Sequence, residues 1–237
     1  MLLYYLLGII LIPGIIFAVV AQTKVTNAYD RYKKIACAKQ LTASQVARQM
    51  LDGSGLKHIQ IKQIQGHLTD NYNPKTGVIS LSQSVYNDTS VAAIGIAAHE
   101  VGHAIQFRDK YKPLIMRNII IPIVNISSRM LWPLIVIGIL FNFLIIPGSV
   151  FGEIMLWVGI VFFGLSMILS VITLPVEYDA SKRAYKMLTA TDTLTNEEAF
   201  GAKNVLDAAA LTYVAALVVS ILSFLRFLLF ILSVRRN

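Results

Sequence analysis

Long runs of apolar residues with almost no charge are the feature that most restricts how this chain can fold. The first run, Leu2–Ala21, has 20 residues without a charge, which is the length a helix needs to cross the hydrocarbon core of a bilayer. Met130–Ile146 and Phe151–Val176 flank a Pro147–Ser149 turn and predict a transmembrane hairpin. Leu211–Val234 is the last apolar run. Only 14% of the chain is charged, against about 25% in soluble domains, so composition also indicates a membrane protein.

The distribution of basic residues predicts the topology. Residues 22–112 carry 12 Lys and Arg, and residues 177–210 carry four, whereas the hairpin turn carries none. The positive-inside rule therefore predicts that both polar blocks lie in the cytoplasm. A signal peptide would have a basic region and a shorter apolar core, and no basic residue precedes the first run, so that run is predicted to be an uncleaved anchor. The net charge of +8 is assigned to lipid headgroups and topology, and no nucleic-acid-binding motif is present. Arg226 inside the last run leaves open whether that segment spans the membrane or is re-entrant.

Two histidines and a glutamate stand together at the end of the small-residue stretch "AAIGIAAHEVGH". His99 and His103 are four residues apart on a predicted helix, so both imidazoles share one face and can bind one zinc ion at about 2.0–2.1 Å. Glu100 can reach a metal-bound water, as in the H-E-x-x-H arrangement where the glutamate is the general base. The alternative is three ordinary helix residues, but two of only four histidines fall here. The sequence therefore predicts a zinc site.

A catalytic zinc ion takes three protein ligands and keeps a fourth position open, so a third ligand must come from elsewhere. Glu177 is the preferred candidate because it directly follows an apolar run and begins the predicted helix "EYDASKRAY". His58 and His67 remain alternatives, and an acidic residue favoured by the helix dipole is the explanation of Glu177 without a metal. The single cysteine, Cys37, excludes a cysteine-rich zinc site and an internal disulfide.

The segments "SLSQSVYNDTSVAAIGIAAHEVGHAIQ" and "TLPVEYDASKRAY" closely resemble the YugP-like neutral zinc metallopeptidases of bacterial membranes, over nearly the whole chain. More distantly, they resemble the HtpX-like and CAAX-prenyl membrane proteases, which are gluzincins. The resemblance implies Zn²⁺ held by His99, His103 and Glu177, with Glu100 as the catalytic residue.

The resemblance also bears on the surroundings of the zinc ligands. The distant relatives have an aspartate four residues after the glutamate ligand, where it orients a histidine. In this chain that position is Ser181, and the nearest acid is Asp179. Asp179 is therefore predicted to support a zinc-bound histidine; a solvated acid paired with Lys182 or Arg183 is the alternative.

Capping residues predict where the polar helices begin and end. The stretch "TASQVARQMLDGSGL" predicts a helix that begins at Thr42 or Ser44 and ends at Gly53 or Gly55. Thr195, with Glu198 three residues later, predicts a capping box before a further helix. The helical stretch that contains "HEVGH" is predicted to break near Asn87–Asp88.

Period-two and turn signals predict a small sheet between the polar helices. "HIQIKQIQG" and "VISLS" predict two strands, and "TDNYNPKTG" is typical of a turn. In gluzincins an edge strand upstream of the zinc helix pairs with extended substrate, so a plain core strand and a substrate-binding strand are both compatible with this segment. The substrate-binding residues would be Gly77, Val78, Ile79, Ser80, Leu81 and Ser82.

The predicted fold class is mainly α: a multi-span integral membrane protein with a gluzincin-like zinc metallopeptidase domain that carries a small β-sheet. We divide the chain into an N-terminal transmembrane anchor (1–21), the first half of a cytoplasmic peptidase domain with the HEVGH helix (22–112), an interfacial segment and transmembrane hairpin (113–176), the second half of the peptidase domain with the glutamate ligand (177–210) and a C-terminal membrane segment (211–237).

The predicted function is a zinc-dependent endopeptidase of the cell membrane with its active site facing the cytoplasm. Its partners would be protein or peptide substrates and the lipid bilayer, with no nucleic acid. An uncontrolled cytoplasmic protease would be hazardous, so a regulatory membrane partner is also considered. The competing hypotheses are a non-catalytic membrane scaffold with a structural zinc site and a transporter, although acids are scarce within the spans. Substrate identity and oligomeric state stay open.

Overall fold

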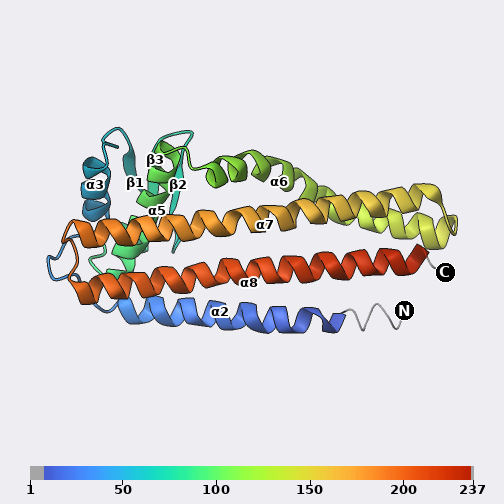
Figure 1. Ribbon diagram of the computed structural model, residues 1–237, viewed down its shortest axis with the longest axis horizontal. Helices are drawn as coiled ribbons and strands as arrows, with labels where there is room; N and C mark the ends of the chain where they lie inside the picture. Colours follow the sequence, from blue (N-terminus) through green and yellow to red (C-terminus); the bar gives the residue numbers. More distant parts are fainter. Residues whose placement is uncertain (1–7, 236–237) are drawn as a thin grey trace. The chain divides into compact units, whose positions relative to one another are not determined.

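The computed structural model describes residues 8–235, so residues 2–7 of the predicted anchor lie outside the described part (Figure 1). The fold is mainly α with one small sheet, as predicted. The elements are α2 (Leu11–Tyr32), α3 (Ala43–Gly53), β1 (Gln60–Ile64), β2 (Asn71–Asn73), β3 (Val78–Ser82), α4 (Gln83–Tyr86), α5 (Val91–Arg108), α6 (Lys112–Ile139), the π-helix η1 (Leu140–Ile145), α7 (Val150–Ala190) and α8 (Asn196–Arg235).

The chain forms two compact units, which are described separately. We call them the helical unit (Met1–Val19, Ile115–Leu174 and Tyr213–Asn237) and the mixed unit (Val20–Leu114 and Pro175–Thr212). Helices α2, α6, α7 and α8 each contribute residues to both units. Several predicted segment boundaries therefore fall inside continuous helices, and the roles assigned to those segments stay predictions.

Within the mixed unit, capping residues set where the shorter helices begin. Thr42 and Gln45 form a reciprocal capping box at the start of α3, as the prediction of a cap near Thr42 required. Gly55 follows the end of α3 with a φ of 73°, a left-handed conformation that suits glycine. Thr195 and Glu198 form the predicted capping box before α8. Local sequence signals therefore determine these helix ends.

The sheet of the mixed unit has three strands in the order β1-β3-β2. β1 runs parallel to β3 with Gln60 opposite Val78, and β2 runs antiparallel to β3 with Asn71 opposite Ser80. The prediction that "TDNYNPKTG" is only a turn is corrected, because its Asn71–Asn73 portion pairs as β2. Three residues are too short for a period-two pattern to be visible in the sequence.

The strand predicted at "VISLS" is confirmed as β3, Val78–Ser82, but it is the central strand and not an edge. β1 pairs along Val78–Ser82, and β2 occupies the other side at Val78, Ile79 and Ser80. A substrate backbone needs unpaired N–H and C=O groups to add to a strand. An open edge was expected along Gly77, Val78, Ile79, Ser80, Leu81 and Ser82. This expectation is wrong for Val78, Ile79 and Ser80, because both β1 and β2 pair with them.

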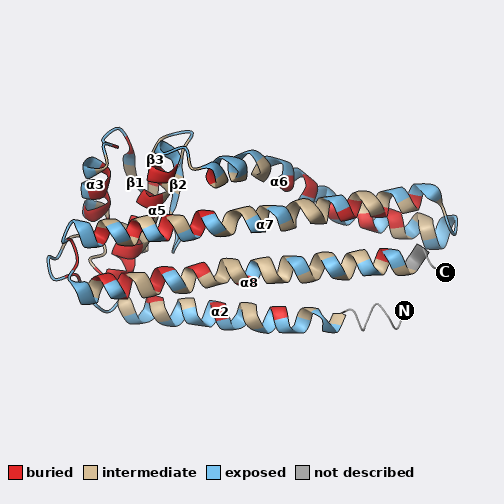
Figure 2. Cartoon of the chain, viewed as in Figure 1, coloured by how far each residue is buried: buried red, intermediate tan, exposed pale blue. Residues whose placement is uncertain are grey.

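The core of the mixed unit surrounds α5, which is buried along most of its length (Figure 2). Small side chains make this possible, because they let other helices approach α5 closely. A Cβ atom on Gly95 would lie 3.3 Å from the Cβ atom of Ala202 on α8. A Cβ atom on Gly102 would lie only 2.4 Å from the carbonyl oxygen of Ala180 on α7. The "AAIGIAAHEVGH" stretch is thus a packing surface as well as a carrier of histidines.

The helical unit turns its apolar side chains outward. Ile126, Trp132, Leu144 and Val150 are each about two-thirds exposed or more. Four helices in residues 8–235 are long and apolar enough to cross a membrane: Leu11–Tyr32, Lys112–Ile145, Val150–Ala190 and Asn196–Ser233. The molecule is therefore a multi-span membrane protein. Within the described residues, the predicted C-terminal membrane segment is part of one unbroken helix, α8, and its crossing of the membrane stays a prediction.

Candidate metal centre

The two histidines are presented by α5, whose start is fixed by its cap. The Ser90 side chain accepts a hydrogen bond from the Ala93 amide, and the Asp88 carboxylate accepts one from the Ser90 amide. The break predicted near Asn87 and Asp88 separates α4 from α5, as expected. With helical spacing fixed from Val91 onward, His99 and His103 fall on one face. Their ring centroids lie 4.7 Å apart, with the rings nearly perpendicular.

α7 brings Glu177 to the same point. Its Oε2 atom lies 3.1 Å from His99 Nε2 and 3.6 Å from His103 Nε2. One ligand atom from each of the three residues lies within 4.8 Å of the others. Ligands bound tetrahedrally to one ion at 2.0–2.1 Å are about 3.3 Å apart. The measured separations fall on either side of that value, so these three residues could hold a divalent metal ion.

The site is largely shielded from solvent, which suits a metal centre with one open position. The His99 and His103 side chains are 17% and 12% exposed, and that of Glu177 is 3% exposed. The alternative histidines do not join this cluster. His58 is exposed on the surface, and the His67 ring packs edge-on against Tyr29.

The close approach of α5 and α7 depends on Gly102, which lies between His99 and His103 in the sequence. Any side chain there would meet the backbone of Ala180, three residues after Glu177. Gly102 is visible in the sequence inside "HEVGH", but the helix against which it packs could not be identified from the sequence.

The Nδ1 atoms of both histidines, which are not the nitrogens closest to Glu177, have polar partners. Ser181 Oγ lies 3.1 Å from His99 Nδ1, at the position where the distant relatives have an aspartate. Gln106 Oε1 lies 3.0 Å from His103 Nδ1. Asp179 contacts neither histidine directly; it accepts hydrogen bonds from Gln106 and from Arg183. Asp179 is thus linked to His103 only through Gln106, and it also makes the ion pair with Arg183 that was the alternative, so its support of a zinc-bound histidine stays a prediction. Gln106 was not predicted from the sequence, although it lies three residues after His103.

Glu100 lies beside the cluster and is buried, with 8% of the residue exposed. Burial raises the pKa of its carboxyl group, and the charges of His99 and His103 oppose that rise. A raised pKa brings a carboxylate closer to the pH at which a general base works best.

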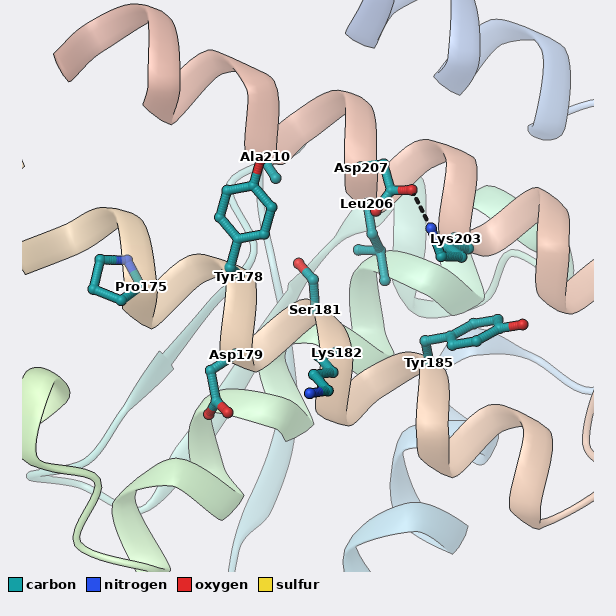
Figure 3. A pocket seen from close by; sticks show the side chains of 10 residues that line it. All are labelled: Pro175, Tyr178, Asp179, Ser181, Lys182, Tyr185, Lys203, Leu206, Asp207 and Ala210. Carbon is teal, nitrogen blue, oxygen red and sulfur yellow. Dashed lines mark hydrogen bonds and ion pairs between the residues drawn. The ribbon is translucent and has the colours of Figure 1, made fainter. Parts of the chain in front are cut away.

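A cavity of about 370 Å³ lies between α7 and α8 within the mixed unit (Figure 3). Tyr178 and Ser181 project from α7 toward α8, whereas Asp179 and Lys182 project to the other side (Figure 3). Ser181 lines this cavity and also contacts His99 Nδ1, so it connects the cavity to the metal-ligand candidate. The lining residues are Pro175, Tyr178, Asp179, Ser181, Lys182, Tyr185, Lys203, Leu206, Asp207 and Ala210.

A multi-span helical protein with two histidines and a glutamate around one point belongs to the class of membrane proteins with a candidate metal centre. Comparison with known families makes this more specific: residues 7–232 match the family described as "Putative neutral zinc metallopeptidase", and the chain belongs to that family. It is similar to the "Putative membrane protease YugP" of Bacillus subtilis (strain 168), with 38% identity over 216 residues, covering 91% of this chain and 92% of the relative. No solved structure gives a significant match to the chain.

Proposed function

We propose that this protein is an integral-membrane zinc-dependent endopeptidase of the gluzincin type that cleaves membrane or membrane-proximal proteins. The observation that carries the proposal is the convergence of His99, His103 and Glu177 within 4.8 Å of one another. The family description and the name of the Bacillus subtilis relative support zinc and peptide hydrolysis. The active site faces the cytoplasm in this proposal, because the polar blocks that supply these residues are rich in Lys and Arg.

Each residue of the site has a defined role in the proposed reaction. His99, His103 and Glu177 would hold the zinc ion through two imidazole nitrogens and one carboxylate oxygen. When bound, zinc would polarise the scissile carbonyl and lower the pKa of its bound water to about 7. The Glu100 carboxylate takes the proton from the attacking water and then donates it to the nitrogen of the leaving amine. Burial of Glu100 supports this role, since it raises the pKa of the carboxyl group and so favours uptake of a proton.

The count of ligands favours catalysis over a structural zinc site. Structural sites are closed by four protein ligands, whereas catalytic sites use three and leave one position for water or substrate. In residues 8–235, three His and Glu side chains converge at this point. This supports the enzyme over the non-catalytic scaffold.

Replacement of Glu100 by Gln tests the proposal. The variant keeps the shape of the side chain but cannot accept the proton, so we expect stoichiometric zinc to remain while hydrolysis falls about 10²–10⁴-fold. The measurements are zinc content by elemental analysis and cleavage of an unfolded protein by the detergent-solubilised enzyme. Chelation should abolish the activity of the unmodified enzyme, and added zinc should restore it.

Glu197→Gln is the matched control, because Glu197 is exposed at the start of α8 and the same chemical change there should leave activity intact. Cleavage by Glu100→Gln at the rate of the unmodified protein would rule out the proposed mechanism.

A further inference from the structure

Gln106 is a polar side chain with no exposed surface, and every polar atom of its amide has a partner. A buried amide costs free energy unless its hydrogen bonds are made, so a fully bonded one inside a core holds a defined orientation. This amide lies between α5, which carries the two histidines, and α7, which carries Glu177.

The partners of Gln106 determine which end of the amide is the donor. Its Nε2 atom lies 2.7 Å from the Val176 carbonyl oxygen and 2.9 Å from Asp179 Oδ2. The carbonyl oxygen can only accept hydrogen bonds. Asp179 Oδ2 also accepts at 2.6 Å from Arg183 Nε, as an ionised carboxylate does. Two acceptors consume both hydrogens of the amide nitrogen, so the NH₂ group must be at this end and the oxygen at the other.

The amide oxygen therefore faces His103 Nδ1, at 3.0 Å. Because an amide oxygen only accepts, Nδ1 must carry the hydrogen of this bond. In the neutral imidazole, Nε2 then has its lone pair free, and it is Nε2 that lies 3.6 Å from Glu177 Oε2. We propose that Gln106 is a positioning residue that fixes the tautomer and ring orientation of His103 for metal binding. This inference rests on the metal centre of the proposed function.

The two histidines are held differently. Ser181, the partner of His99, has a hydroxyl group that can donate or accept, so it fits either tautomer of the ring. Gln106 fits only one tautomer of His103, because the Val176 carbonyl and Asp179 leave its amide no freedom to turn over. Loss of Gln106 should therefore weaken metal binding more than loss of Ser181.

The test measures the zinc dissociation constant of the full-length protein in detergent, by competition with a chelating dye. Gln106→Leu keeps the approximate volume and removes the hydrogen bonds, and we expect zinc to bind about 10–100-fold more weakly. Ser181→Ala should weaken binding less. Gln106→Glu keeps an acceptor for His103 but places a second carboxylate against Asp179, so zinc binding should also weaken.

A double variant separates positioning from simple packing. In Gln106→Glu combined with Asp179→Asn, the new carboxylate accepts from His103 Nδ1 and the new amide donates to that carboxylate. The donor between positions 106 and 179 is thereby restored, although the Val176 carbonyl oxygen, which accepts from Gln106 in the unmodified protein, then faces a carboxylate oxygen. Zinc binding should therefore recover in part relative to Gln106→Glu alone. Failure of the double variant to recover any affinity would count against a positioning role.

Asn204→Leu is the control for lost stability. It removes a partly buried hydrogen bond to the Tyr32 hydroxyl in the same unit, away from the histidines. It should lower the melting temperature and leave the zinc dissociation constant unchanged. Equal zinc affinity in Gln106→Leu and the unmodified protein would overturn the inference while leaving the metal centre intact. Absence of zinc binding by the unmodified protein would instead overturn the proposed function.

Discussion

The two units of this protein differ in where they place large apolar side chains: the mixed unit buries them, and the helical unit exposes many of them. In the mixed unit, Leu51 of α3 is completely buried in a core that α5 and the sheet share. In the helical unit, Leu144 of η1 is 71% exposed, and most of its apolar neighbours also face outward. Such an outer surface would be unstable in water but is expected in lipid. Each unit is therefore built for a different solvent.

Both units nevertheless use glycine to bring helices together. In the helical unit, a Cβ atom on Gly152 would lie 2.7 Å from the Asn142 backbone nitrogen; in the mixed unit, one on Gly102 would lie 2.4 Å from the Ala180 carbonyl oxygen. In lipid, close packing has to replace the hydrophobic effect as the force between helices. In the mixed unit it serves a site, because it brings Glu177 to the histidines. The same local device thus has two consequences.

A matched pair of truncations gives the largest expected difference between the units. Leu51→Ala should lower the free energy of unfolding by about 3–5 kcal/mol, since it removes a fully buried side chain and leaves a cavity. Leu144→Ala should change it by less than about 0.5 kcal/mol, since that side chain borders solvent or lipid. Chemical denaturation of both variants in the same detergent measures the difference. Equal losses would show that the two units are not stabilised differently.

The parts of the fold that are encoded locally could be predicted. The apolar runs, the capping boxes at Thr42 and Thr195, and the i, i+4 pairing of His99 and His103 all depend on residues close together in sequence. Glu177 could be named because of its position after an apolar run and because of the family resemblance, and the structure brings it to the histidines.

The parts that depend on tertiary pairing could not be predicted. β2 is visible only through its pairing with β3, and that pairing makes β3 a central strand. Gln106 has no meaning in the sequence until α7 supplies its acceptors. The continuity of α7 through Pro175 was also missed, since proline usually marks a boundary in a soluble helix but is tolerated in membrane helices.

A second matched pair tests whether the outer surface of the helical unit meets lipid. Val161 on α7 and Phe200 on α8 are both 59% exposed, but only Val161 belongs to the helical unit. Val161→Lys should cost about 2.5–3.5 kcal/mol of membrane insertion if its surroundings are hydrocarbon. Phe200→Lys should be tolerated, since a lysine on a hydrated surface is ordinary. The measurement is the fraction of each variant that resists extraction of membranes with alkali.

The comparison would fail if the two lysine variants inserted equally well, because the exposed apolar surface of the helical unit would then not be a lipid contact. Poor insertion of Phe200→Lys alone would mean that the mixed unit, and not the helical unit, contacts the lipid. Loss of insertion by Val161→Lys alone supports the division into a lipid-facing unit and a hydrated one.

The smallest expected effect concerns the charged end of the mixed unit. Asp109, just after α5, accepts hydrogen bonds from Arg108 at 2.8 Å and from Arg183 of α7 at 2.5 Å, and these bonds hold its pKa below the usual value of 3.8. A carboxylate with a lowered pKa in the folded state stabilises the fold above its unfolded pKa, near pH 4, and loses that contribution as the pH falls through the lower folded value. Asp109→Asn should therefore reduce stability at pH 7, by less than about 1 kcal/mol because a third of the side chain is exposed.

Denaturation of the unmodified protein and of Asp109→Asn at pH 7 and pH 2.5 measures this contribution. The difference between the two proteins should be largest at pH 7 and shrink in acid, and 1 M salt should reduce it at pH 7, because the pair is screened by water and ions. Such sensitivity to salt belongs to a hydrated surface. A difference that persisted unchanged in acid or in salt would mean that Asp109 acts through packing between α5 and α7 rather than through its charge. The mixed unit would then depend on packing at this position, as the helical unit does, and not on a hydrated ion pair.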